Sequence, residues 1–190
     1  MEVCHDSNLR KYFEEGKKLF ATGHTKESID YFTRAEEEGC NPVNVYLSRG
    51  AAYLNIGRLA EAVADFNRVL DIDSDNERAY YYRGIVHLRE GNYDAAVDDL
   101  TNSIVRNNER GPAFLARGLA YGELGKEEEA MRDFKTAVVF SDIEVESFIH
   151  GFGSHRTMFE KSLMLLEGER GPWKMVLDET EANRIKKWLQ

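Results

Sequence analysis

The chain has 190 residues, the size of one domain or at most two small ones. Its 42% hydrophobic and 31% charged residues exclude an intrinsically disordered chain. The net charge of −9 argues against nucleic acid or an anionic membrane surface as the main partner, because both carry negative charge.

The N-terminal residues 1–8 are polar, and we expect them to be frayed. They lack the basic and then apolar pattern of a signal peptide, and no later stretch approaches 18 uncharged apolar residues. The two cysteines, Cys4 and Cys40, are too few for a disulfide framework, although one bridge is formally possible. These features predict a reduced, cytoplasmic protein.

From residue 9 to residue 144, a pattern recurs every 34 residues. Two of its columns are glycine: Gly16, Gly50, Gly84 and Gly118, and then Gly23, Gly57, Gly91 and Gly125. The others are aromatic (Tyr12, Tyr46, Tyr80, Phe114), small (Ser28, Ala62, Ala96, Ala130) and large apolar (Phe32, Phe66, Leu100, Phe134). Five columns in register over four cycles indicate tandem repeats.

Each cycle predicts two helices joined by a turn. In the second cycle, aromatic, small and apolar residues recur at i, i+4 and i+7 on both sides of Gly57, which can adopt the positive φ that a turn needs. Gly50 and Ala62 are small enough to let the two helix backbones approach closely, at about 8 Å. The corresponding residues in the other cycles are Gly16, Gly84, Gly118, Ala96 and Ala130. Because one pair cannot bury both faces, neighbouring pairs must stack.

These motifs resemble the tetratricopeptide repeat (TPR) family. Its aromatic-x₂-Leu-Gly-x₂-Tyr core corresponds to Tyr46-x₂-Arg49-Gly50-x₂-Tyr53, and its Ala-x₃-Phe motif to Ala62 and Phe66. The usual Leu is replaced by Arg or Glu in every copy, and the usual terminal Pro by residues that can also form a turn, such as Asp142. The resemblance implies an all-α, right-handed α-solenoid of helix-turn-helix repeats over residues 9–42, 43–76, 77–110 and 111–144.

Beyond the repeats, residues 145–190 are expected to form C-terminal capping helices, because terminal repeats need atypical caps. Apolar residues at helical spacing continue to Leu166, and Gly151 and Gly153 suit a break. A final amphipathic helix is expected over residues 173–190. It either caps the solenoid or occupies the groove described next.

The family places one side of the first helices in the concave groove of the superhelix, which we therefore expect to bind a partner. Apolar residues on this side suit an amphipathic helix or an extended peptide, and Tyr and Arg are common binding hot spots. Packing between repeats would explain about half of the residues on this side. It explains Arg78, Tyr82 and Arg89 least well. The candidate residues are Phe13, Lys17, Phe20, Leu47, Ser48, Leu54, Arg78, Tyr81, Tyr82, Ile85, Arg89, Leu115 and Leu119.

No pattern in the sequence predicts a catalytic residue, a metal site or a cofactor. Asp71-x-Asp73-x-Asp75 lacks the later Gly and Glu of a calcium loop and is expected to be a turn. A clamp for the C-terminal carboxylate of chaperones, known in some family members, is not expected, because only Arg78 keeps the required basic side chain.

We therefore expect a non-enzymatic scaffold that binds a protein or peptide partner, with no nucleic acid or membrane involved. The alternative is a self-associating assembly protein, which would use the groove or its C-terminal helix to form a homo-oligomer.

Overall fold

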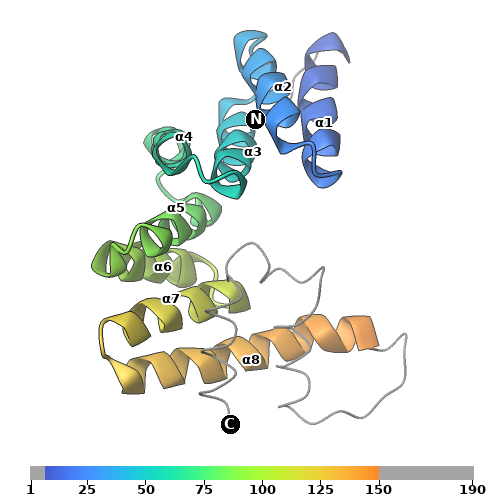
Figure 1. Cartoon of the computed structure of the whole chain (residues 1–190). Coiled ribbons are helices and arrows are strands. Elements are labelled where there is room, and N and C mark those ends of the chain that lie inside the picture. The colour runs from blue at the N-terminus through green and yellow to red at the C-terminus, as the bar shows by residue number, and fades with distance from the viewer. Residues whose placement is uncertain (1–6, 150–190) are drawn as a thin grey trace. The chain divides into compact units, whose positions relative to one another are not determined.

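The computed structural model describes residues 7–149, which form helices joined by short turns (Figure 1). The helices, in chain order, are α1 (Ser7–Ala21), α2 (Thr25–Glu37), α3 (Pro42–Asn55), α4 (Leu59–Ile72), α5 (Glu77–Arg89), α6 (Tyr93–Arg106), α7 (Gly111–Glu123) and α8 (Glu127–Ile149). The prediction of an all-α chain is confirmed for these residues. None of the helices in this range has the length and hydrophobicity of a membrane span.

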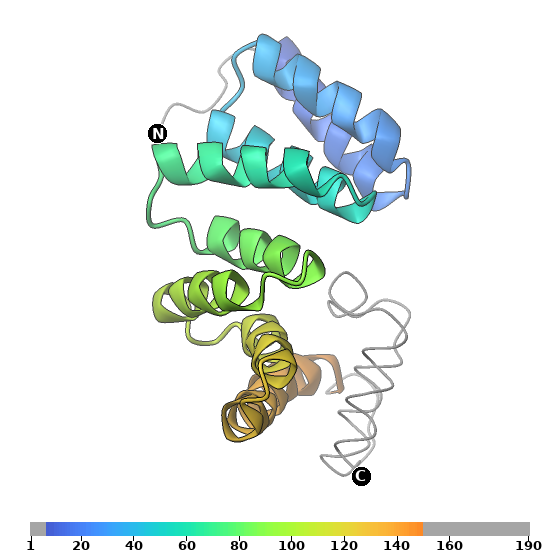
Figure 2. The same ribbon diagram turned by 60° about the vertical axis from the view of Figure 1, so that its left-hand side comes forward.

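The helices pack in sequential pairs: α1 with α2, α3 with α4, α5 with α6, and α7 with α8 (Figures 1 and 2). The chain divides into two units, one with α1–α6 (residues 1–106) and one with α7 and α8 (residues 107–190). Within the first unit, successive pairs also contact one another through α2 and α3 and through α4 and α5. The predicted tandem helix pairs are therefore confirmed.

The turn inside each pair contains a glycine with positive φ, as the second glycine column predicts. At Gly57, with φ of 78°, the N–H donates to the carbonyl of Leu54, and the N–H of Arg58 donates to that of Tyr53. These bonds satisfy carbonyls that the end of α3 leaves without helical partners, as in a Schellman motif. The equivalent residues in the other pairs are Gly23, Gly91 and Gly125.

Asparagine starts the first helix of two repeats, which explains how these repeats form without the family's terminal proline. The side chain of Asn41 accepts a hydrogen bond from the N–H of Asn44, and Asn76 accepts one from Ala79. Such N-caps satisfy one of the free N–H groups of the first turn.

The glycines of the first column face a large side chain of the second helix. A Cβ at Gly50 would lie 2.6 Å from Phe66, and one at Gly84 would lie 2.8 Å from Leu100. Gly16 and Gly118 face Phe32 and Phe134 in the same way. The sequence pattern pairs Gly50 with Ala62, whereas the side chain nearest to Gly50 is that of Phe66, 16 residues along the chain. The small column of the second helices is fully buried in all four repeats, at Ser28, Ala62, Ala96 and Ala130.

The expectation of a turn at Asp142 is wrong, because α8 continues unbroken to Ile149 and has 23 residues, against 14 in α4 and α6. The sequence contains no Gly or Pro between Glu127 and Ile149 that would end the helix. Residues 145–149 therefore extend the second helix of the last pair. The remaining predicted cap, including the amphipathic helix over residues 173–190, lies outside the described residues, as do residues 1–6.

Replacing Gly84 by Leu should lower the free energy of unfolding by about 1–3 kcal/mol or more, because the new side chain overlaps Leu100. Chemical denaturation measures this loss. Ala60→Leu, at an exposed position of α4, is the matched control and should change stability by about 0.5 kcal/mol or less. Equal stability of the two variants would contradict a close contact at Gly84.

Candidate functional site

The predicted partner-binding residues of the first unit lie on α1, α3 and α5. These helices are neighbours, since α1 contacts α3 and α3 contacts α5. We call the side of the three helices that carries these residues the first-helix face. Its members are Phe13, Lys17, Phe20, Leu47, Ser48, Leu54, Arg78, Tyr81, Tyr82, Ile85 and Arg89. The other two candidates, Leu115 and Leu119, lie on α7 in the second unit.

Several candidates are buried and belong to the packing between helices. On the first-helix face these are Leu47, Leu54, Tyr81 and Ile85, and on α7 they are Leu115 and Leu119. Their side chains fix the helices in place and offer little area to a partner.

The rest of the first-helix face reaches the surface. Lys17, Arg78 and Arg89 are exposed, and Phe13, Phe20, Ser48 and Tyr82 are half-buried. Lys17 Nζ lies 2.8 Å from a carboxylate oxygen of Glu14 and 5.1 Å from the ring centroid of Phe13. The Phe13 ring also packs against Phe32 of α2, at 5.8 Å between centroids.

Packing explains Tyr82 and Arg89 better than the sequence suggested. The Tyr82 ring stacks on Phe66 of α4, with centroids 5.6 Å apart and an interplanar angle of 14°. The Arg89 Nη1 donates to the carbonyl of Leu54, 3.1 Å away, near the end of α3 where helical carbonyls lack partners. Both residues join neighbouring repeats, whereas Arg78 remains exposed.

An ion pair between an arginine and a buried aspartate recurs in three repeats, and the sequence pattern did not predict it. Arg49 donates from Nε and Nη2 to both carboxylate oxygens of Asp65, at 2.8 and 2.9 Å. The same bidentate pair forms from Arg83 to Asp99, at 2.7 and 2.8 Å, and from Arg117 to Asp133, at 2.7 and 2.9 Å. The arginine stands where the family usually has Leu, and the aspartate follows 16 residues later. That constant spacing is the signal that could have revealed the pair.

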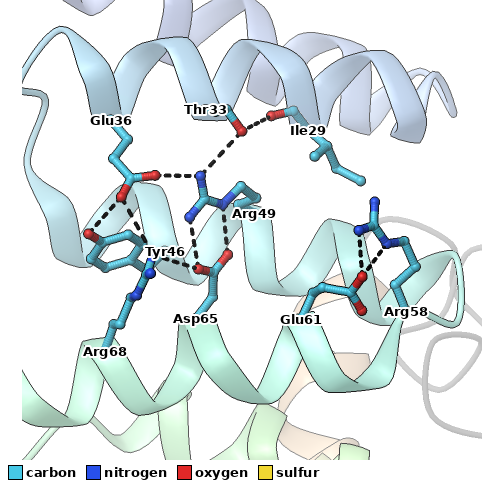
Figure 3. A network of polar contacts seen from close by, with 9 residues as sticks. All are labelled: Ile29, Thr33, Glu36, Tyr46, Arg49, Arg58, Glu61, Asp65 and Arg68. Carbon is cyan, nitrogen blue, oxygen red and sulfur yellow. Dashed lines mark hydrogen bonds and ion pairs between the residues drawn. The ribbon is translucent and has the colours of Figure 1, made fainter.

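Arg49 also bonds to the preceding repeat, so that one side chain connects α2, α3 and α4 (Figure 3). Its Nη1 donates to the Thr33 hydroxyl and to Glu36, which in turn accepts a hydrogen bond from the Tyr46 hydroxyl at 2.8 Å. Arg83 repeats this geometry by donating to Asn67 Oδ1 of α4, at 2.7 Å. Within α1–α6, each of these arginines therefore joins its own repeat to the one before it.

The charges in this network support one another. Partial burial alone would raise the pKa of Glu36, but hydrogen bonds from Tyr46 and Arg49 outweigh it and hold that pKa below the usual value. Burial likewise tends to lower the pKa of the Arg49 guanidinium, while Asp65 and Glu36 raise it overall. Arg49 therefore stays charged inside the array.

Among residues 7–149, no group of three or more His, Cys, Asp and Glu side chains is placed to hold a metal ion. The segment from Asp71 to Asp75 ends α4 and leads to α5, as predicted for a turn. There, Asn76 donates to Asp73 at 2.9 Å, and Asp75 forms an ion pair with Arg106 at 3.1 Å. Cys40 is buried, and Cys4 lies outside the described residues.

Replacing Arg49 by Leu should destabilise the protein by about 3–5 kcal/mol, because the buried Asp65 then loses its bidentate partner and keeps only the longer ion pair to Arg68, at 3.8 Å. Thermal or urea unfolding measures the loss. Arg34→Leu removes an exposed arginine of α2 and is the control, with an expected change of about 0.5 kcal/mol. Similar losses in both variants would show that the pair contributes no more than a surface charge.

The lowered pKa of Glu36 predicts a loss of stability in acid. A carboxyl group with a lower pKa in the folded state stabilises the protein at neutral pH, and this contribution disappears as the pH falls through the folded-state pKa. Urea midpoints measured between about pH 5 and pH 3 should therefore fall less in Glu36→Gln than in the wild type. Glu37→Gln, at an exposed neighbour, should follow the wild-type profile. Parallel profiles for Glu36→Gln and the wild type would refute this role.

Comparisons with known proteins agree with this geometry. A family model for the TPR repeat matches residues 50–91, and one for the tetratricopeptide repeat matches residues 111–138. No curated protein matches the chain.

Solved structures with the same fold include a crystal structure of MamA, with a TM-score of 0.65, 22% identity and coverage of 73% of this chain and 81% of that one. YrrB gives a TM-score of 0.61 at 18% identity over 70% of this chain and 68% of that one. The second TPR of Spaghetti (RPAP3) gives 0.51 at 27% identity over 53% of this chain and 93% of that one. These structures share the fold, and the two family models, together with the repeated helix pairs, show that the chain is a tetratricopeptide repeat protein.

Proposed function

We propose that the chain is a non-enzymatic scaffold that binds a peptide or an amphipathic helix on the first-helix face. Proteins of this family mediate protein–protein interactions. The observation that carries the proposal is the combination on this face of exposed cations, such as Lys17 and Arg78, with half-buried aromatic rings, such as Phe20 and Tyr82. Arg and Tyr are frequent hot spots, since they combine contact area with hydrogen bonding.

The packing below the face supports a preformed surface. Its members Leu47, Leu54 and Ile85 are buried, and the ring of Tyr82 is held against Phe66. A surface that changes little on binding loses less conformational entropy, which favours affinity.

Two of the similar structures are described as peptide-binding proteins. YrrB is described as a TPR protein with an unusual peptide-binding site, and the Spaghetti repeat is bound to the HSP90 peptide SRMEEVD. These two structures support a peptide as the type of partner. Because their identity to this chain is low, they do not indicate the sequence of the peptide that it binds.

The ionisable groups also favour a scaffold, because the shifts in pKa have structural causes. The pKa values of Arg83 and Arg117 are raised overall by Asp99 and Asp133, their partners in the ion pairs. Glu61 has a lowered pKa because it accepts hydrogen bonds from Arg58 on the surface. The family is generally non-enzymatic, in keeping with these roles. A cytoplasmic location remains a prediction.

Mapping the amide chemical shifts of the labelled full chain tests the proposal. The ligand is a 12-residue peptide selected from a random library against the immobilised protein. We expect the changes in amide chemical shift on adding the peptide to concentrate in α1, α3 and α5, because these helices form the first-helix face. Shifts confined to α2, α4 and α6, or failure to select any peptide, would contradict the proposal.

A matched pair of variants adds a control. Lys17 and Lys18 each form an i,i+3 ion pair with a glutamate, but only Lys17 belongs to the first-helix face. Lys17→Ala should weaken the binding of the selected peptide, and Lys18→Ala should leave the affinity for that peptide unchanged.

Sedimentation over a range of concentrations addresses the alternative of self-association, which a concentration-independent monomer would eliminate.

A further inference from the structure

Where a first helix packs on the preceding repeat, its side is apolar around one arginine. In α3 this side carries Val45, Arg49 and Ala52. Val45 and Ala52 belong to a buried cluster that includes Ile29 of α2, and Arg49 Nη1 donates to the Thr33 hydroxyl of the same helix, at 3.2 Å. The joint between the first two repeats therefore combines apolar packing with one polar contact.

The joint between the second and third repeats follows the same rule. Ala79, Arg83 and Val86 occupy the equivalent positions of α5, each 34 residues further along the chain. Ala79 and Val86 are fully buried, and Arg83 donates to Asn67 of α4. We call these three places on a first helix the joint positions. In α3 and α5 they hold two buried apolar side chains and an arginine that reaches an acceptor on the preceding second helix.

In α1, all three joint positions hold charged residues. They are Lys11, Glu15 and Lys18, each 34 residues before its counterpart in α3. Lys11 is exposed, and the side chains of Glu15 and Lys18 are 41% and 72% exposed. Lys18 Nζ lies 3.5 Å from Glu15 Oε1, so this ion pair forms on the surface of α1 itself. The side of α1 that corresponds to a joint is therefore hydrophilic.

The aspartate that binds the arginine is also replaced in the first repeat. Tyr31 of α2 stands where the later second helices have Asp65 and Asp99. Its ring packs against that of Tyr12, with centroids 6.3 Å apart, and the guanidinium of Arg34 lies over it at 5.8 Å. Both members of the Arg–Asp pair have changed together, which links the exchange to the whole joint rather than to one residue.

We infer that α1 is a closed end of the stack, and that Lys11, Glu15 and Lys18 prevent a further helix pair or a second copy of the chain from packing there. A helix pair placed in the register of the other joints would bury three charges that are now solvated. Only one ion pair, of 3.5 Å, would accompany them. Desolvating charges without a full set of partners is costly. Copies of the chain cannot extend one another's stack at α1, so any self-association uses another surface.

An added helix pair tests the closed end. A second copy of residues 43–76, inserted between residues 8 and 9 of the full chain, places α4 directly before α1 in the 34-residue register. Four substitutions then give the first repeat the residues that follow α4 in the native chain, namely Lys11→Ala, Glu15→Arg, Lys18→Val and Tyr31→Asp. We expect limited proteolysis to remove the inserted pair about tenfold more slowly from the substituted chain than from the unsubstituted one, because cleavage follows the population of the open form. Mass spectrometry of the trimmed chain measures this rate.

Two controls separate stacking from folding. The four substitutions without the insertion should leave the helical circular dichroism unchanged, because all four positions are exposed or half-buried. The inserted chain that keeps Glu15 but carries the other three substitutions should lose most of the protection, because a buried carboxylate then stands where the other joints have a guanidinium.

Equal rates of removal in the substituted and unsubstituted chains overturn the inference, whether the inserted pair is protected in both or in neither. The wild-type chain offers a second test, in which the amide shifts of Lys11, Glu15 and Lys18 should stay constant over the concentration range of the sedimentation experiment. Concentration-dependent shifts there would place a second copy on α1 and would equally overturn it. Peptide binding is tested separately, because the first-helix face is another side of α1 and its shifts extend to α3 and α5.

Discussion

The interaction on which the repeat array depends is the buried arginine–aspartate pair. Arg49 and Asp65 meet with both carboxylate oxygens engaged, and the same guanidinium reaches Glu36 and Thr33 of the preceding repeat. Buried charges are costly to desolvate, so their full complement of hydrogen bonds is what makes them tolerable. They also favour one relative position of three helices, because a bidentate pair is specific in geometry.

A fixed stack is what gives the first helices a common surface. Repeat arrays are held together by contacts between neighbouring units, and in α1–α6 these contacts combine apolar packing with polar bonds. The stack of Tyr82 on Phe66 and the bond from Arg89 to Leu54 add to the arginine network. The same side chains that hold the repeats together therefore shape the face proposed to bind a peptide, while Arg78 is left to solvent.

The sequence could predict the period, the helix pairs and the turn glycines, because each is a local pattern repeated in register. The turn expected at Asp142 followed the family's repeat length, although the sequence has no Gly or Pro between Glu127 and Ile149 that would end α8. Arg49 was recognised only as a departure from the family motif, and its role required a partner 16 residues away. The contact between Arg89 and Leu54 spans 35 residues, and only the fold brings them together.

A double-mutant cycle at Arg83 and Asp99 tests the central claim most directly, with the free energy of unfolding measured for the wild type, Arg83→Leu, Asp99→Leu and the double variant. We predict that the double variant loses less stability than the two single variants together, with a coupling of about 1–3 kcal/mol, because Arg83→Leu leaves the buried Asp99 without this partner and Asp99→Leu leaves the half-buried Arg83 without its own. Additive losses, with a coupling near zero, would contradict it.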